Sequence, residues 1–248
     1  MSSDFAKALT FLKDNPGLVT DKLARHLEIS GEAVLIAVVI GLPLGVCLGH
    51  VHRFSFLAIN ISNLGRALPS LGVLAILLPY VGVGSTDVII ALVVLAFPPI
   101  LTNAYVAVDQ VEPETVDAAR GMGLRPMQVL LKIELPQALP LMFAGVRTSA
   151  VFVVATATLA GIFGGGGLGE IINDRESYGL DGIIGVSYVL ILLAFLVQIV
   201  FTVLEWSVTP RGIRTARRPG RSRLLRRRAT VHPERGAPAE AGSGPHVE

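Results

Sequence analysis

Residues 117–136 read DAARGMGLRPMQVLLKIELP, a mixture of charged, small and apolar residues between two long apolar segments. The flanking segments, residues 88–108 and 138–163, contain a single charged residue, Arg147. Each is long enough to cross the apolar core of a bilayer as a helix, which takes roughly 20 residues. The stretch is therefore predicted to lie in a loop between two membrane helices, and its ordered pattern indicates more than a simple connection.

The rest of the chain has the composition of a membrane protein. Of its 248 residues, 52% are hydrophobic and only 16% are charged, whereas soluble domains carry about 25% charged residues. Three further segments are long and apolar: residues 33–49, residues 54–79 and residues 183–204. The first can be extended to residue 29 through Glu32, and the second is interrupted only by Arg66. We predict an all-α, polytopic membrane protein with about five transmembrane helices.

The distribution of basic residues predicts the orientation of these helices, because Lys and Arg in short loops favour the cytoplasmic side. Basic residues occur in the loop after the first span, in the loop of residues 109–137 and in the C-terminal tail. The turn of residues 80–87 has none, and acids outnumber the one arginine in residues 164–182. The 109–137 loop and the C-terminus are thus expected inside the cell. Five spans then place the N-terminus outside, although it carries Lys7, Lys13, Lys22 and Arg25.

The two ends of the chain differ from the membrane domain, which we assign to residues 29–208. Residues 1–28 lack the apolar core of a secretory signal. They repeat Phe5, Leu9, Phe11 and Leu12, a spacing that predicts a short amphipathic helix at the membrane surface. Residues 209–248 are rich in Arg, Pro, Gly and Ala and are expected to form a disordered cytoplasmic tail near anionic lipid. Charge alone would also fit nucleic acid, but the membrane surface is the simpler partner.

The 109–137 loop has the signals of two short helices. Pro113 suits a first helical position, and Glu114 and Asp117 suit the early turns, where the helix dipole favours acids. Gly121 and Gly123 then supply a stop, since glycine adopts the left-handed conformation of a helix C-cap.

A second helix is expected to begin at Pro126 and to end at Pro136, before the next membrane helix. Its apolar residues are predicted to share one side. These are Met127, Leu130, Leu131 and Ile133.

The same loop resembles the EAA motif of permease subunits of ATP-binding-cassette (ABC) importers. The spacing agrees throughout, from an acid-Ala-Ala triplet to a Gly and then to Ile-x-Leu-Pro. The matching positions are Asp117, Ala118, Ala119, Gly123, Ile133, Leu135 and Pro136. The one departure is Asp117, where the family usually has Glu; the charge is kept and the side chain is one methylene shorter.

The resemblance covers roughly residues 20–208 and implies a five-helix permease whose motif loop docks on a cytoplasmic ATPase subunit. It also implies a pair of ATPase subunits, an extracytoplasmic solute-binding protein and a second permease chain, expected as an identical copy. No G-x-x-x-x-G-K-[ST] phosphate loop occurs in the chain. ATP and Mg²⁺ are therefore expected to bind the partner ATPase, with no cofactor, metal or catalytic residue in this chain.

For the substrate, residues 67–71 (ALPSL) and 144–169 resemble the corresponding parts of osmoprotectant importers, which carry glycine betaine, carnitine, choline or proline betaine. An importer of methionine or another amino acid is the alternative within the class. A secondary transporter is expected to show paired halves with matching broken helices, and the five spans show no such repeat. A membrane-embedded enzyme would need clustered His, Asp, Glu or Cys within the spans, which the sequence lacks.

Polar residues and prolines within the spans are candidates for lining the transport path, because they free or satisfy backbone groups next to a cavity. The candidates are Ser70, Pro98, Pro99, Thr102, Asn103, Thr156 and Thr158. Simple helix kinking and hydrogen bonding between helices account for them equally well. Arg66 could equally serve the transport function or extend its charge to the membrane interface. For Arg147 the structural role, with the charge at the interface, is expected. The run GGGGLG (residues 164–169) follows a helix, so a close-packed break at the outer mouth is expected, not a dinucleotide site.

Overall fold

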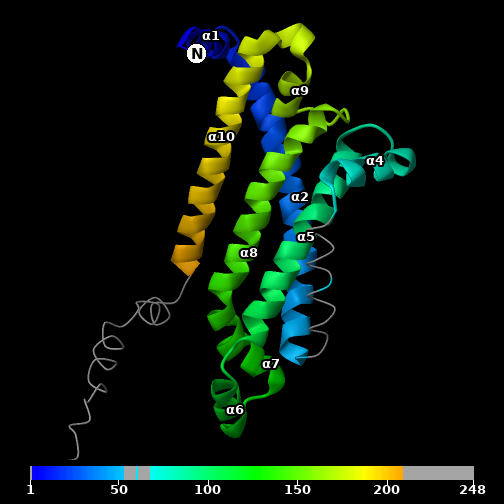
Figure 1. Ribbon diagram of the computed structural model, residues 1–248. Helices are drawn as coiled ribbons and strands as arrows, with labels where there is room; N and C mark the ends of the chain where they lie inside the picture. The colour runs from blue at the N-terminus through cyan, green and yellow to red at the C-terminus, as the bar shows by residue number, and fades with distance from the viewer. Residues whose placement is uncertain (1, 53–59, 61–67, 209–248) are drawn as a thin grey trace, which may run out of the picture. The chain divides into compact units, whose positions relative to one another are not determined.

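The computed structural model describes residues 2–52, 60 and 68–208, and the described residues contain helices and turns but no β-strand (Figure 1). Within them, four helical segments are long and apolar enough to cross a membrane. They are α2 (Pro16–Val51), α5 (Ser85–Asp109), the helical run Pro126–Gly161 and α10 (Arg175–Val208). The predicted all-α, polytopic fold is confirmed.

The predicted span over residues 54–79 lies mostly outside the described residues, as does Arg66. Its last part forms the shorter apolar helix α4 (Ser70–Val81). The described part of the chain therefore accounts for four of the five predicted spans and for the end of the remaining one.

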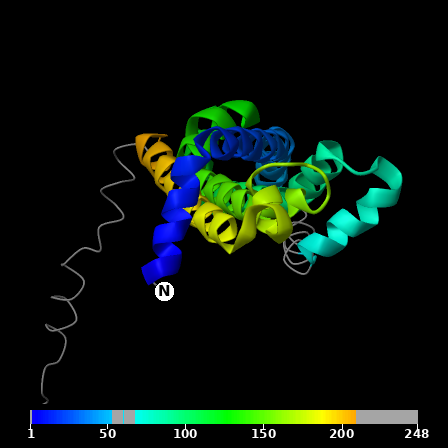
Figure 2. The same cartoon turned by 90° about the horizontal axis from the view of Figure 1, so that it is seen from above.

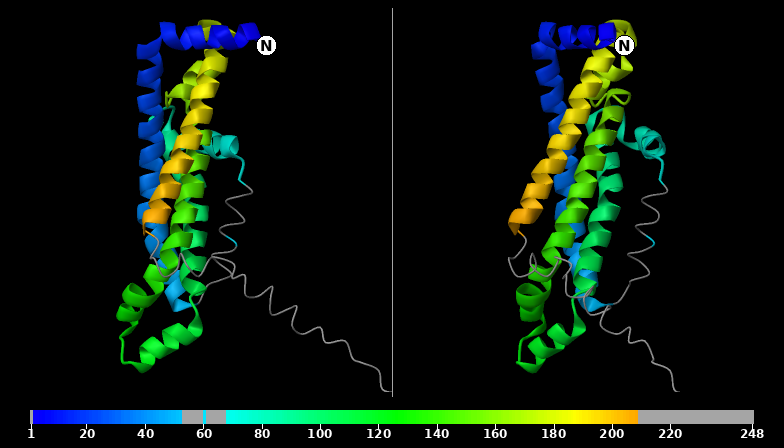
Figure 3. Two further views of the ribbon diagram at one scale, coloured as in Figure 1. Left: turned by 90° about the vertical axis from the view of Figure 1, so that its left-hand side faces the viewer. Right: turned by 60° about the vertical axis from the view of Figure 1, so that its left-hand side comes forward.

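The helices α2, α5, α8 (Leu135–Thr156) and α10 lie side by side (Figures 1 and 3). Contacts at successive turns show that α2 and α5 run in the same direction, since Gly41 faces Ile100 and Gly45 faces Ala104. The loop of residues 109–137, hereafter the motif loop, joins α5 to α8 at one end of these helices. The opposite end holds residues 164–169, hereafter the glycine loop, together with α9 (Leu168–Asn173).

Glycines spaced four residues apart bring α2 and α5 into backbone contact. A Cβ atom added at Gly45 would lie 2.6 Å from the Cβ of Ala104, and one at Gly49 would lie 2.7 Å from the carbonyl oxygen of Tyr105. In lipid there is little hydrophobic drive between helices, and small residues at this spacing strengthen van der Waals packing. Helices α2 and α5 are therefore a tightly packed pair.

The N-terminal residues form the predicted amphipathic helix α1 (Ser2–Asp14), which lies across the start of α10 (Figures 1 and 2). The rings of Phe5 and Tyr188 meet edge to face at a centroid distance of 5.6 Å. Phe11 and Tyr178 meet in the same manner at 6.5 Å. Helix α2 begins at Pro16, so the expected boundary between residues 28 and 29 lies within a continuous helix.

At the glycine-loop end, α8 passes into a 3₁₀ turn, η2 (Ala157–Gly161), and the chain then turns back through the glycine loop into α9. A Cβ atom added at Gly169 would lie only 1.8 Å from the carbonyl oxygen of Thr158. Glycine is therefore required here by the close approach of two backbones. Helix α10 follows Asp174, whose carboxylate accepts the backbone N–H of Ser177 at 3.0 Å. Hydrogen bonds from Ser177, chiefly from its side chain, lower the pKa of the Asp174 carboxyl.

Candidate functional site

The first helix of the motif loop, α6 (Pro113–Gly121), is followed by Gly123, whose φ is +84°. The N–H of Gly123 donates to the carbonyl of Arg120 at 2.9 Å, and the N–H of Leu124 donates to the carbonyl of Ala119 at 3.2 Å. These two bonds form a Schellman motif, which needs a left-handed residue at the position of Gly123. The predicted helix start and glycine cap are both present, although Gly121 belongs to the helix itself.

The second helix, α7 (Pro126–Val129), begins where Pro126 predicts, with the Gln128 side chain accepting the N–H of Arg125 at 2.9 Å. It does not end at Pro136, and that expectation is wrong. A π-helical turn, η1 (Leu130–Glu134), leads directly into α8. In a regular α-helix the ring of Pro136 would collide with the carbonyl four residues earlier. In the wider π turn the N–H of Leu135 donates to the carbonyl of Leu130. This turn lets the helix continue through the proline.

A small apolar cluster holds the two short helices together. Its buried members come from both halves of the loop: Val111, Val116, Ala119 and Val129, with Leu124 and Ile133 packed against them. The prediction that Met127, Leu130, Leu131 and Ile133 share one side is wrong. Leu130 is buried, whereas Met127 and Leu131 are 62% and 55% exposed, because the helix presents them to the opposite face.

Some of the motif residues therefore pack in the interior of the loop, and others lie exposed on its surface. Ala119 and Ile133 pack inside the loop, and Leu135 packs against α5 and α8 side chains. Asp117 and Ala118 are exposed, and Asp117 lines a pocket of about 240 Å³ between α6 and the ends of α2 and α5. The ionisable side chains of this pocket are those of Asp117, Asp109, Arg120 and His52. Met122, 72% exposed, adds a further apolar side chain to the outer surface of the loop.

A buried carboxylate in the motif loop was missed from the sequence. Glu134 is fully buried, and its Oε2 lies 2.6 Å from Nδ1 of His50 at the end of α2. A signal for it exists in the sequence, since Glu134 continues a stripe at four-residue spacing formed by Leu130, Ala138 and Met142. A single acid within such an apolar stripe indicates a specific partner.

The predicted pathway residues lie in α4, α5 and α8 and in the turn after α8. Pro98, Pro99 and Asn103 lie in α5, and the Asn103 side chain donates to the carbonyl of Pro99 at 2.7 Å while contacting Gly145 of α8. The hydroxyl of Thr158 donates to the carbonyl of Ala155 at 2.8 Å in the turn after α8.

Of the remaining three candidates, Thr102 shares α5 with Pro98, Pro99 and Asn103. Thr102 is half-buried in α5, Thr156 ends α8, and Ser70 begins α4. Hydrogen bonding between helices is provided instead by Ser149, whose buried hydroxyl donates to the carbonyl of Ala96 in α5 at 2.9 Å.

Arg147 has a structural partner on a neighbouring helix. Its guanidinium lies 2.8 Å from the carboxylate of Glu205 and donates to the hydroxyl of Thr202 at 3.3 Å. Both partners belong to α10, so the pair ties α10 to α8.

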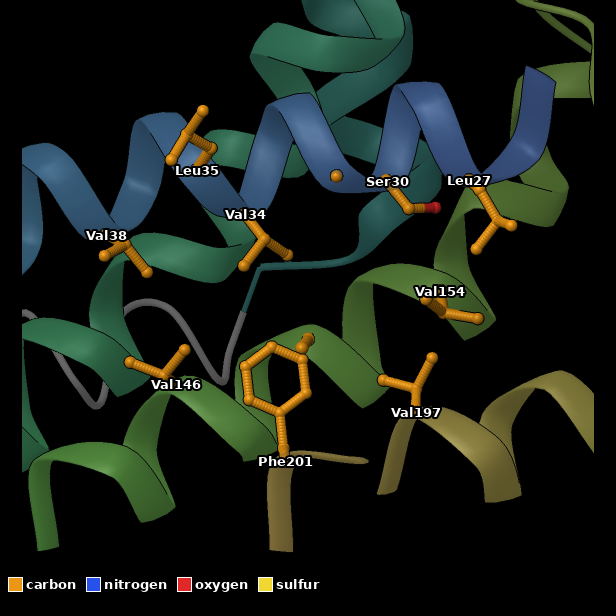
Figure 4. A pocket seen from close by; sticks show the side chains of 11 residues that line it. Leu27, Ser30, Val34, Leu35, Val38, Val146, Val154, Val197 and Phe201 are labelled. Atoms are coloured by element: carbon orange, nitrogen blue, oxygen red, sulfur yellow. The ribbon is translucent and has the colours of Figure 1, made fainter. Parts of the chain in front are cut away.

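A groove of about 390 Å³ opens between α2, α8 and α10 (Figure 4). Its lining is apolar, including Val34, Val146 and Phe201, apart from the hydroxyl of Ser30. None of the seven candidate pathway residues lines it. The groove is therefore separate from the predicted transport path.

Comparison with known proteins now identifies the chain's class. The family of binding-protein-dependent transport system inner membrane components matches residues 37–211, a range that includes the whole motif loop. The chain belongs to this family. It is thus a multi-pass membrane protein and a permease component of an ABC importer.

Curated relatives extend the match over nearly their whole length. The carnitine transport permease protein OpuCB of Listeria monocytogenes is 35% identical over 213 residues, which are 86% of this chain and 98% of that protein. The glycine betaine/carnitine/choline transport system permease protein OpuCB of Bacillus subtilis (strain 168) is 35% identical over 83% of this chain and 95% of its own. Both are named as permeases for osmoprotectants.

Solved structures agree with the fold. An inward-facing MetNI methionine ABC transporter matches with a TM-score of 0.70 at 25% identity, covering 79% of this chain and 99% of that chain. A second crystal form of the same transporter gives a TM-score of 0.67 at 27% identity, covering 75% and 94%. The permease fold predicted from the motif loop is confirmed.

Proposed function

We propose that this chain forms the transport path of an ATP-driven importer for osmoprotectants such as glycine betaine, carnitine or choline. The observation that carries the proposal is the 35% identity to a carnitine permease over 98% of that protein's length. A match of this extent includes the membrane helices as well as the motif loop, so it bears on the transported substrate and not only on the class. A relative named for choline transport, OpuBB of Bacillus subtilis (strain 168), is 36% identical over 82% of this chain.

In this proposal the chain performs no covalent chemistry, and a partner ATPase binds ATP and Mg²⁺. The absence of a phosphate loop from the sequence supports this division. Closure of two ATPase subunits would move the motif loops, and the attached helices would then alternate between outward and inward openings by rigid-body tilting.

The outer surface of the motif loop has the properties of a docking face. Met122 and Met127 are largely exposed although the loop is firmly packed beneath them. Flexible, polarisable methionines are common at binding surfaces, and the adjoining pocket offers the carboxylate of Asp117 to a basic side chain or a backbone N–H of the partner. The coupling residues proposed from the motif are Asp117, Ala118, Ala119, Gly123, Ile133, Leu135 and Pro136.

The orientation and assembly follow from the charge pattern and the family. The motif loop and the Arg-rich C-terminus are assigned to the cytoplasm by the positive-inside rule. A second copy of the chain completes the path, for which Ser70, Pro98, Pro99, Thr102, Asn103, Thr156 and Thr158 remain the candidate lining. An extracytoplasmic binding protein delivers the substrate, and aromatic side chains in such a protein would hold a quaternary ammonium group by cation–π contacts.

The test is uptake by the complete complex, with its ATPase and binding protein, in sealed vesicles. Labelled glycine betaine, carnitine and choline are compared with labelled methionine, with ATP or with ADP inside the compartment that holds the ATPase. The proposal expects ATP-dependent uptake of at least one osmoprotectant and none of methionine. Uptake of methionine alone would assign the chain to the amino-acid importers instead.

A further inference from the structure

Glu134 stands out because it is the one charged member of an apolar stripe that faces α2 and α5. The stripe is formed by Leu130, Ala138 and Met142, which pack with Ala104 and Val108 of α5. Glu134 occupies the position between Leu130 and Ala138 and is fully buried. Burying a carboxylate is costly unless it is paired, so its retention in this stripe points to a task beyond packing.

The pairing of Glu134 depends on one residue. Its Oε2 lies 2.6 Å from Nδ1 of His50, whose side chain is 19% exposed. Its Oε1 has no hydrogen-bond partner among the described residues. The contact with His50 is thus the specific polar connection of this side chain.

His50 itself is held firmly in place. The preceding residue, Gly49, packs so closely on α5 that an added Cβ would lie 2.9 Å from Cβ of Val108. The end of α2 is therefore fixed against α5, and His50 presents its ring from this fixed end. The Glu134–His50 contact joins the π-helical turn of the motif loop to the α2–α5 pair.

We propose that Glu134 and His50 are positioning residues that transmit movement of the motif loop to α2. The inference rests on the proposed function, because it assigns a route to the coupling between ATPase and transport path. When a partner moves the loop, α8 follows through the continuous helix. The Glu134–His50 contact carries α2 along in the same movement, whereas α5 is joined to the loop directly through the chain.

The decisive variant removes the contact without leaving a buried charge: Glu134→Met combined with His50→Leu. Replacing both partners of a buried polar contact by apolar residues of similar shape can leave stability nearly unchanged or raised, so the complex is expected to assemble. The readout is substrate taken up per ATP hydrolysed in vesicles containing the complete complex. Coupling between sites typically corresponds to a factor of 5–150, and we expect this ratio to fall by about fivefold or more with ATP hydrolysis retained.

Two matched variants separate positioning from packing. Glu134→Gln keeps the shape and can still accept a hydrogen bond from His50, so it should keep most of the coupling ratio. Arg25→Gln with Glu28→Gln removes a 2.6 Å ion pair between two residues of α2. Because this pair does not join α2 to another element, its loss should leave the ratio unchanged. Thermal unfolding of each complex reports stability independently of transport.

The outcomes are distinguishable. A wild-type ratio in the Glu134→Met/His50→Leu complex overturns this inference and leaves the proposed function standing. A reduced ratio that tracks a lowered unfolding temperature also overturns it, since the pair would then act only through stability. A wild-type complex without ATP-driven uptake overturns the proposed function and this inference together.

Discussion

The two ends of the membrane helices use glycine in different ways. In the motif loop, Gly123 supplies a left-handed turn, and an added Cβ would meet nothing within 4 Å. At the other end, Gly169 is needed because it has no side chain: the backbone of Thr158 occupies the space that a Cβ atom would take. The motif-loop end thus keeps an open surface over a packed interior, whereas the glycine-loop end is closed by backbone contacts. The difference fits the proposal that a partner acts on the first end while the second holds its shape.

The largest effect is expected at Gly169. In Gly169→Val the new side chain collides with backbone that cannot move aside, so the free energy of unfolding should fall by about 3 kcal/mol or more. The measurement is thermal unfolding of the purified chain in detergent. Gly31→Ala is the control, since nothing lies within 4 Å of its added Cβ, and an alanine within a helix should be stabilising by about 0.5–1 kcal/mol. Equal stability of the two variants would contradict the close packing.

At Gly123 the expected effect is on coupling rather than on folding. Gly123→Glu places a charge on the docking face and strains the backbone by about 1–2 kcal/mol, so ATP-driven uptake should fall by about tenfold. Gly123→Asn is the matched control, because Asn tolerates the left-handed region and adds no charge. Unchanged uptake in Gly123→Glu would show that this surface does not dock.

Exposed methionine on the motif loop provides a third test. Met127→Glu should weaken binding of the ATPase subunit by about tenfold, the cost of losing a well-packed interface side chain. The unfolding temperature should not change, because Met127 is 62% exposed. The measurement is ATPase affinity by titration of the reconstituted permease. Val83→Glu alters an equally exposed apolar residue outside the motif loop; a similar loss of affinity there would contradict a local docking face.

The smallest effect is expected from the ion pair at the glycine-loop end. Lys22 and Glu170 lie 2.6 Å apart and tie α2 to α9, but their side chains are 24% and 40% exposed. Partly exposed pairs contribute at most about 1 kcal/mol. Lys22→Met should therefore lower the free energy of unfolding by no more than about 1 kcal/mol, with a weaker effect in high salt. A larger loss would mean that charges rather than backbone contacts close this end.

The motif loop was predictable because its local signals are decisive. Pro113, Pro126 and Gly123 each have a restricted or special backbone conformation, so they mark helix starts and a turn without knowledge of the fold. The prediction that a helix ends at Pro136 was wrong because the effect of this residue is not decided locally. Whether a proline ends a helix or is accommodated by a π turn depends on the packing of the neighbouring residues, which single-residue rules do not contain.

The transport path was not predictable in the same way. Asn103 and Thr158 stay candidate lining residues, and their side chains hydrogen-bond the carbonyls of Pro99 and Ala155, four and three residues earlier in the chain. A sequence cannot distinguish such local bonding from exposure to a path. Glu134 was missed although its position in the apolar stripe is visible, because its partner His50 is 84 residues away.

Hydrogen exchange, measured on the full-length permease with and without its ATPase subunits, would show whether the motif loop is where the ATPase docks. We predict slower exchange over residues 113–128 when the ATPase binds, because the exposed face of the motif loop becomes covered. Residues 164–173 at the opposite end should exchange at the same rate in both states. Unchanged exchange over residues 113–128, in a complex shown to contain the ATPase, would contradict the assignment of this loop as the docking element.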